Sequence, residues 1–269
     1  AIARDLEAWF AVEQRQLPWR DTYDPYHVWL VEVMAQQTRL DVVLPYFERF
    51  IARFPDVRTL AAASEEDVLA LWSGLGYYRR ARMLRAAAID ICERFGGEVP
   101  RNHQELLGID GIGRYTAGAI ASIAFDDAQP VVDGNVARLL ARLERIGHPL
   151  GSGALAREEW KLAGSLVAAA SSPRALNQSM MELGARICRP RNPDCANCPV
   201  ARHCRAAKAG DADVFPRATA KPKSESVVIP LFLVVNERGE ILMRRERGRL
   251  LQGMFALPHG DGALTSSPA

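Results

Sequence analysis

Apolar residues recur at helical spacing over most of the first 172 residues of this chain. A period of three to four residues is typical of α-helices that bury one face. The run that begins at residue 40 shows the pattern: Leu40, Val43, Leu44, Phe47, Phe50 and Ile51. Proline and glycine lie mostly between such runs, where helices begin and end. The sequence therefore predicts a mainly α fold, built as a bundle of short helices.

The length of 269 residues indicates about two domains at roughly 150 residues each. We expect a helical domain over residues 1–208, a linker over 209–226 and a β domain over 227–269. The apolar run Val227–Val235, the turn Asn236–Gly239 and a second apolar run predict a β-hairpin. The β domain is too short to close its own core, so we expect it to be incomplete.

No apolar stretch approaches the length of a membrane span, and residues 1–5 lack the pattern of a signal peptide. The sequence therefore favours a soluble, intracellular protein. The net charge of +2 does not by itself indicate a partner. The basic residues are mostly arginine, and the chain has no lysine before Lys161.

Two local clusters of arginine stand out against this low net charge. The first follows Tyr77 and Tyr78 and contains Arg79, Arg80, Arg82 and Arg85. The second surrounds a group of cysteines and contains Arg186, Arg189, Arg191, Arg202 and Arg205. Each cluster either neutralises phosphates or covers a solvated helix face.

Four of the five cysteines, Cys188, Cys195, Cys198 and Cys204, lie in the spacing C-x6-C-x2-C-x5-C. Such crowding of thiols predicts a metal site. Disulfides are disfavoured, because nothing in the sequence indicates secretion. Structural zinc sites usually pair two short knuckles across a longer gap. Here one knuckle lies between two wider arms, which favours an iron-sulfur cluster, with zinc as the alternative.

A glycine hairpin lies at Gly111-Ile112-Gly113, between two short helical runs. A tight turn that enters a helix presents unpaired amides, and glycine lets a phosphate approach them closely. A plain turn is the alternative interpretation of two glycines.

Two carboxylates occupy positions suited to acid catalysis. Glu32 lies inside an apolar helical run, where burial raises the pKa of a carboxyl and keeps its proton available. Asp133 precedes Gly134-Asn135 and a helical stretch, so it is also a candidate helix N-cap. Breaking a glycosidic bond requires a proton on the leaving group and negative charge near the sugar cation. Glu32 and Asp133 could supply the two functions.

Six motifs carry a family resemblance: Leu17-Pro18-Trp19, Glu32 to Thr38, Gly74 to Tyr78, Gly111 to Gly113, Val132 to Val136 and the four cysteines. Together they resemble the helix-hairpin-helix DNA glycosylases, and more closely their adenine-specific, MutY-type branch. The similarity covers about residues 17–205. The chain departs from the family pattern at Asp110, where proline is common, and at Ala35, where leucine is common.

The resemblance implies a two-lobed helix-hairpin-helix glycosylase fold with a 4Fe-4S cluster on the four cysteines, in a loop at 188–204. It implies that the β domain is a partial Nudix-like fold. It also implies that Glu32 protonates adenine, that Asp133 stabilises the sugar cation, and that Tyr115 and Asn135 support them.

The resemblance further implies which residues contact DNA. Gln37 and Tyr77 would enter the duplex as adenine flips out, and Gly111, Gly113 and Arg114 would face the phosphates. The weaker assignments Trp19, Arg20 and Gln178 would line the adenine pocket.

The expected reaction is hydrolysis of the N-glycosidic bond of adenine mispaired with 8-oxoguanine or guanine. The expected protein is a monomer on double-stranded DNA, in the cytoplasm and at the nucleoid of a bacterial cell. An endonuclease III-like pyrimidine glycosylase and lyase is the first alternative, but such relatives carry a lysine where this chain has Tyr115. A non-catalytic helix-hairpin-helix DNA-binding module is the second, and it would have no use for Glu32 in an apolar run.

Overall fold

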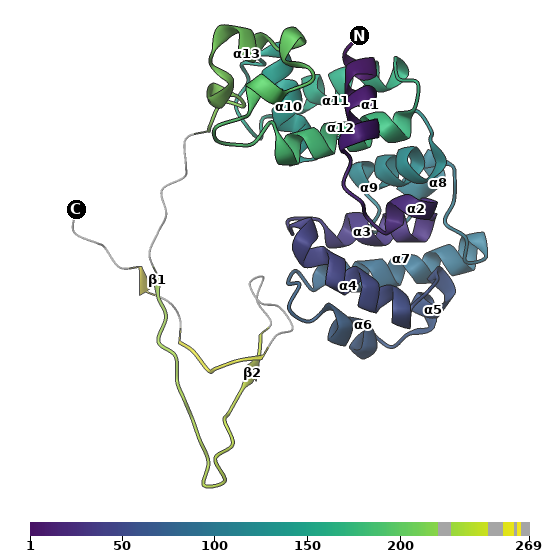
Figure 1. Cartoon of the computed structure of the whole chain (residues 1–269). Coiled ribbons are helices and arrows are strands. Elements are labelled where there is room, and N and C mark those ends of the chain that lie inside the picture. Colours follow the sequence, from purple (N-terminus) through teal and green to yellow (C-terminus); the bar gives the residue numbers. More distant parts are fainter. Residues whose placement is uncertain (220–226, 247–254, 261–262, 265–269) are drawn as a thin grey trace. The chain divides into compact units, whose positions relative to one another are not determined.

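The structure is a computed structural model that describes residues 1–219, 227–246, 255–260 and 263–264. It contains two compact units, Ala1–Thr219 and Ala220–Ala269. The first unit is helical, which confirms the mainly α prediction (Figure 1). Among the described residues, no helix is both long and apolar enough to cross a membrane.

The helical unit has two lobes, each with its own hydrophobic core. The first lobe is one continuous stretch of chain. Its helices are α2 (Trp19–Thr22), α3 (Pro25–Met34), α4 (Leu40–Arg53), α5 (Val57–Ala62), α6 (Glu65–Trp72), α7 (Arg79–Phe95), α8 (His103–Leu107) and α9 (Arg114–Ala119). A π-helical turn, η1 (Ile120–Ala124), follows α9 directly.

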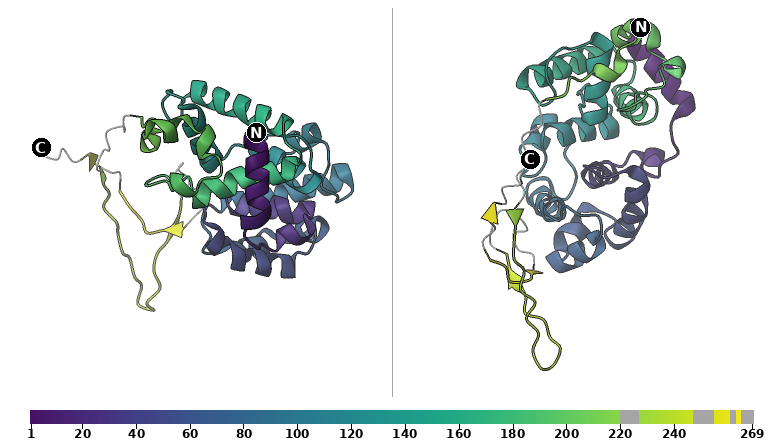
Figure 2. Two further views of the ribbon diagram at one scale, coloured as in Figure 1. Left: turned by 45° about the horizontal axis from the view of Figure 1, so that its top comes forward. Right: turned by 90° about the vertical axis from the view of Figure 1, so that its left-hand side faces the viewer.

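The second lobe combines the N-terminal helix with the later helices of the unit. Its helices are α1 (Ile2–Glu13), α10 (Gly134–Glu144), α11 (Gly153–Ala168), α12 (Pro173–Arg186) and α13 (Arg205–Ala209). Three short 3-10 turns lie around α13: η2 (Cys195–Asn197), η3 (Ala201–His203) and η4 (Ala212–Val214). Helix α1 packs on α12 although the two are far apart in sequence, and Figure 2 shows both lobes from two further sides.

Local sequence signals explain where the site-bearing helices begin. Asp24 caps α3 by accepting hydrogen bonds from the amides of Tyr26 and His27, and Pro25 occupies the first helical position. Ser172 caps α12 in the same way, again followed by proline. Helix α3 buries eight of its ten residues, which explains its nearly continuous apolar run.

The end of the helical unit differs from the expected linker. Residues 209–226 were expected to be linker, but Ala212 and Phe215 are buried in the core of the second lobe. The buried Arg142 side chain donates a hydrogen bond from Nε to the Phe215 carbonyl at 3.0 Å. The helical unit therefore extends past residue 208. Residues 220–226 lie outside the described residues.

The second unit contains two short antiparallel pairs. β1 (Val227–Val228) pairs with β4 (Ala263–Leu264), and β2 (Arg244–Arg245) pairs with β3 (Phe255–Ala256). The expected turn is present, since the Asn236 side chain accepts hydrogen bonds from the amides of Arg238 and Glu240. The strands around that turn are shorter than predicted, with one bridge between Val235 and Ile241.

The apolar side chains of the second unit have no closed core within the described part of the chain. Each of the large apolar side chains between Val228 and Val235 is 47–65% exposed.

Candidate active site

Glu32 and Tyr115, two of the predicted catalytic residues, are joined by a direct hydrogen bond. The Tyr115 hydroxyl on α9 donates to Oε2 of Glu32 on α3 at 2.5 Å. Burial raises the pKa of Glu32 to about 7, the hydrogen bond from Tyr115 opposes this, and the charge of Asp133 adds to it. A carboxyl with a pKa near 7 is matched to donating a proton at neutral pH.

Asp133 is the N-cap of α10, as the sequence allowed. One carboxylate oxygen accepts hydrogen bonds from the amides of Asn135 at 2.9 Å and Val136 at 2.7 Å. The other oxygen accepts from the Asn135 side-chain amide at 3.0 Å. Burial raises the pKa of Asp133, while these donated hydrogen bonds act in the opposite direction. Asn135 therefore holds the Asp133 carboxylate in one orientation.

Two glycines allow the chain around Asp133 to approach both lobes closely. A Cβ on Gly118 of α9 would lie 2.6 Å from the carbonyl oxygen of Pro130. A Cβ on Gly184 of α12 would lie 2.6 Å from the Cβ of Asn135. Real Cβ atoms do not come this close to other atoms. Because these two positions carry no side chain, α9 can pack closely against Pro130 and α12 against Asn135, on either side of Asp133.

The predicted adenine-pocket residues form a hydrogen-bonded network between the lobes. Arg20 donates from Nε to Oε1 of Gln178 at 2.9 Å and from Nη2 to Oε2 of Glu182 at 3.0 Å. Burial alone would raise the pKa of Glu182, but hydrogen bonds from Arg15 and the charge of Arg20 hold it below the usual value. Trp19 is buried and packs edge-on against Phe47, so it supports this region from the core.

Glu182 and Arg15 were missed by sequence reasoning. The Glu182 side chain is fully buried and receives two hydrogen bonds from Arg15, which lies 167 residues away in sequence. A partner at that separation leaves no local pattern.

Gln37 and Tyr77, the predicted intercalating residues, are both exposed and both have a left-handed backbone. Their φ angles are 59° and 49°, and Tyr77 is 59% exposed. Positive φ is uncommon for residues other than glycine and is frequent at functional sites. The two loops that carry these residues are distant in sequence, but Arg80 donates hydrogen bonds to the backbone of both.

The glycine hairpin lies between α8 and α9 as predicted. Gly111 has a φ of 93°, and a Cβ there would lie 3.3 Å from Met83. Gly113 is the N-cap of α9 and offers no side-chain cap, which leaves the first amides of that helix open to an anion. Arg114 is exposed, and its guanidinium stacks on Trp160 of α11 at 3.7 Å from the ring centre.

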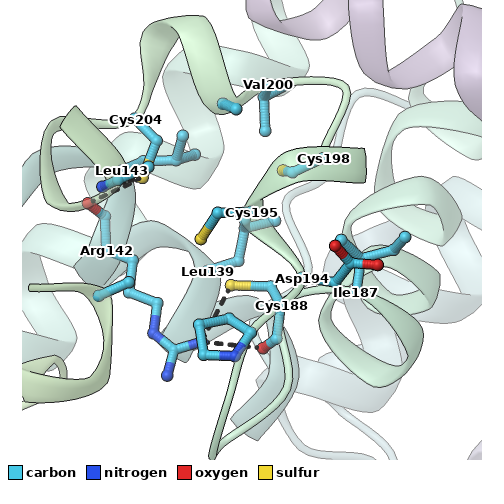
Figure 3. Close-up of a pocket in the computed structure, with 14 residues that line it drawn as sticks. Leu139, Arg142, Leu143, Ile187, Cys188, Asp194, Cys195, Cys198, Val200 and Cys204 are labelled. Carbon is cyan, nitrogen blue, oxygen red and sulfur yellow. Dashed lines mark hydrogen bonds between the residues drawn. The ribbon is translucent and has the colours of Figure 1, made fainter. Parts of the chain in front are cut away.

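The four clustered cysteines line one pocket together with apolar side chains (Figure 3). No group of three or more His, Cys, Asp or Glu among the described residues is placed to hold a single metal ion. Zinc would bring the sulfur atoms close together, because each Zn–S bond is about 2.3 Å. Four thiols are the ligand set of structural zinc sites and also of 4Fe-4S clusters, so the donors of this pocket fit either group.

Two arginines of α10 that the sequence did not single out hold the cysteine loop. Arg142 is buried and donates from Nη1 to the Sγ of Cys188 at 3.3 Å and to the Arg189 carbonyl at 2.7 Å. Arg138 donates from Nη2 to Oδ1 of Asn135 at 2.9 Å and from Nε to the Cys188 carbonyl at 2.8 Å. A chain of hydrogen bonds therefore connects Asp133 to the loop through Asn135 and Arg138.

Several arginines that could have faced phosphates are instead paired within the protein. The pairs are Arg82 with Glu65, Arg186 with Glu13, Arg202 with Asp5 and Arg205 with Glu144. Arg85 donates to the Ala63 carbonyl at 2.6 Å. These members of the two clusters therefore also join segments of the chain.

Comparison with known proteins first defines a class. The profile of the HhH-GPD superfamily base excision DNA repair proteins matches residues 30–161. The structure of a thermostable thymine-DNA glycosylase aligns with a TM-score of 0.67 at 26% identity, over 77% of this chain and 95% of that chain. A trapped endonuclease III–DNA covalent intermediate has the same fold, with a TM-score of 0.63 at 23% identity, over 77% of this chain and 94% of that one.

Proteins of similar sequence identify the branch of this superfamily to which the chain belongs. An adenine DNA glycosylase of Rattus norvegicus is 46% identical over 215 residues, which are 77% of this chain and 42% of that protein. Another, of Buchnera aphidicola subsp. Schizaphis graminum (strain Sg), is 33% identical over 94% of this chain and 73% of its own length. The chain belongs to the adenine DNA glycosylase family. It spans less than half the length of the rat relative.

Proposed function

We propose that this chain hydrolyses the N-glycosidic bond of adenine mispaired with 8-oxoguanine or guanine in duplex DNA. The observation that carries the proposal is the buried Glu32 carboxyl, bonded to Tyr115 and lying in the electrostatic field of Asp133. This pairing of a proton donor with an anchored carboxylate matches the needs of glycosidic bond cleavage.

Glu32 is the general acid of this mechanism. With a pKa of about 7, a substantial fraction of Glu32 is protonated at neutral pH. It gives its proton to N7 of the flipped adenine, and the base leaves with the electron pair of the C1′–N9 bond. Tyr115 holds the carboxyl in place through its hydroxyl.

Asp133 stabilises the positive charge that develops on the sugar. Its carboxylate is fixed by two backbone amides and by Asn135, so little reorganisation is needed as the charge develops. Water then adds to C1′ and loses a proton, which leaves an abasic site.

The reaction proposed here ends at the abasic site, without cleavage of the strand. Strand cleavage by the related lyases needs an amine to form a Schiff base. At the corresponding position this chain has Tyr115, whose hydroxyl is already engaged by Glu32. The chain has no lysine before Lys161.

DNA binding is proposed on three surfaces of the helical unit. The Gly111–Gly113 hairpin and Arg114 face the phosphates, Gln37 and Tyr77 enter the duplex, and Arg20 with Gln178 contacts the adenine edge. The protein acts as a monomer on its DNA. In a bacterial cell such a substrate places it in the cytoplasm at the nucleoid.

The four cysteines are proposed to hold a 4Fe-4S cluster. Cys188, Cys195, Cys198 and Cys204 would be its ligands, and burial raises the pKa of the Cys198 thiol to about 11. Such a thiol becomes a thiolate only with a compensating positive charge, which bound iron supplies. The role of the group would be structural and electrostatic, since Arg138 connects the cysteine loop to Asn135, which in turn holds Asp133.

A substrate panel tests the proposal. The protein is incubated with duplexes that carry adenine opposite 8-oxoguanine, guanine or thymine, and with a duplex that carries an oxidised pyrimidine. We expect adenine release from the first two duplexes, with strand breaks only after alkali. Release of the oxidised pyrimidine, or efficient borohydride trapping of an amine adduct, would support the lyase alternative instead.

A further inference from the structure

Gln37 and Tyr77 are exposed residues with a left-handed backbone, and they lie on loops that follow different helices. The Gln37 loop continues from the end of α3, the helix that carries Glu32. The Tyr77 loop joins α6 to α7. Within the described part of the chain neither side chain makes a hydrogen bond, so the position of each depends on the backbone beneath it, which is left-handed at both residues.

Arg80, in the first turn of α7, binds the backbone beneath the Gln37 loop. Its Nη1 donates to the carbonyl oxygens of Val33 at 3.0 Å and Met34 at 2.9 Å, and also to that of Gln36. The last carbonyls of a helix have no partner within the helix, and they attract positive charge. Arg80 therefore closes the end of α3 and holds the residue that precedes Gln37.

The other guanidinium nitrogen of Arg80 binds the Tyr77 loop. Nη2 donates to the carbonyl oxygens of Leu75 and Gly76, each at 3.4 Å. The guanidinium carbon lies 5.1 Å from the centre of the Tyr77 ring. The same group therefore contacts the backbone just before Tyr77 and the aromatic ring itself.

This arrangement uses the fork of a guanidinium and not only its charge. Arginine presents several donors in a fixed plane, whereas lysine offers one compact ammonium on a flexible stem. An ammonium can reach one of the two loops at a time. Arg80 is half-buried, and its two terminal nitrogens together donate to both loops.

We propose that Arg80 is a positioning residue for base flipping. It holds the Gln37 and Tyr77 loops at one fixed spacing, so that both side chains enter the duplex together when adenine leaves the stack. It does this without contact to adenine or to the reacting atoms. The inference rests on the proposed function and names the residue that prepares the wedge.

The test compares Arg80→Lys and Arg80→Met with the wild type and with Arg79→Met. Arg79 is the exposed neighbour, so its loss removes charge without touching the loops. Base flipping is followed by the fluorescence of 2-aminopurine placed beside the target adenine. Single-turnover excision is measured with adenine opposite 8-oxoguanine and with adenine opposite an abasic site, where flipping needs less energy.

We expect Arg80→Lys to slow flipping and excision from the mispair by about tenfold or more, as displaced contacts remote from the chemistry can do. Excision of the unpaired adenine should stay close to the wild-type rate. Arg79→Met should weaken duplex binding, most strongly at low salt, but leave flipping of bound DNA unchanged.

Two results would overturn the inference. Wild-type flipping by Arg80→Lys would show that charge alone suffices, and equal slowing on both substrates would show a general distortion around Glu32. If the wild type itself released no adenine, the proposed function would fail, but the fluorescence measurement would still test the loops because it requires only binding.

A double-mutant cycle keeps the test informative if Arg80→Met unfolds. Thermal unfolding and circular dichroism establish which variants are folded. Tyr77→Ala removes one of the two positioned side chains, so Arg80→Lys should cost less in that background than in the wild type. Additive effects of the two substitutions would contradict the proposed coupling.

Discussion

Replacing Tyr115 by phenylalanine should move the pH dependence of excision in a defined direction. The Tyr115 hydroxyl donates to the Glu32 carboxylate at 2.5 Å and so stabilises the ionised form of Glu32. Burial raises the pKa of Tyr115 well above its usual value, so the hydroxyl remains a donor throughout the useful pH range. Removing it takes away a stabilising contact from the carboxylate only.

The size of the effect follows from the strength of such bonds. A hydrogen bond to a charged group contributes about 1.5–3 kcal/mol, and one pKa unit corresponds to about 1.4 kcal/mol. Loss of the bond should therefore raise the pKa of Glu32 by about one unit or more above its value of about 7. The pH above which excision declines should rise by the same amount.

The assay is single-turnover excision of adenine opposite 8-oxoguanine between about pH 5 and pH 9. The maximal rate of Tyr115→Phe should fall because the acid is held less firmly, but the decline at high pH should begin later. Tyr26→Phe is the matched control, since its buried hydroxyl donates to the Phe54 carbonyl at 2.9 Å and does not contact Glu32. An unchanged or lower alkaline limb in Tyr115→Phe would refute the assigned hydrogen bond.

Three further predictions concern stability and the cysteine loop. Because burial raises the pKa of Glu32 from 4.5 to about 7, ionisation of this carboxyl destabilises the fold above pH 4.5. Glu32→Gln should therefore be more stable than the wild type by about 3 kcal/mol at pH 8 and equally stable at pH 4. Thermal unfolding at both pH values checks this. Gly184→Ala should destabilise by about 1–3 kcal/mol and slow excision, because its Cβ would meet Asn135 at 2.6 Å; unfolding in urea and single-turnover rates measure the two effects. Cys198→Ser should lower iron and sulfide content and the visible absorbance, and stoichiometric zinc without iron in anaerobically prepared wild type would contradict the cluster assignment.

The residues that the sequence predicted best are those whose signal is local. Glu32 lies in an apolar run that had to be buried, and burial is what shifts its pKa. Asp133 stands directly before a helix, and the N-cap geometry follows from that position. The four cysteines lie within seventeen residues, so the chain between them cannot separate them far.

The residues that the sequence missed act through partners distant along the chain. Arg15 and Glu182 pair across 167 residues. The sequence places Arg80 in an arginine cluster but does not reveal its role, because Arg80 contacts backbone carbonyls that any sequence would supply. For the same reason, the sequence alone could not distinguish arginines that bind phosphates from arginines that pair within the protein. Arg202 is held by Asp5, at the opposite end of the helical unit's sequence.

The central claim is that Glu32 delivers the proton that releases adenine. The most direct measurement compares the wild type with Glu32→Gln on a duplex that carries adenine opposite 8-oxoguanine, under single-turnover conditions and with the dissociation constant measured in parallel. The amide keeps the shape of the side chain but has no acidic proton to deliver. We predict nearly unchanged binding and no detectable adenine release by the variant, and release at a rate near that of the wild type would contradict the account.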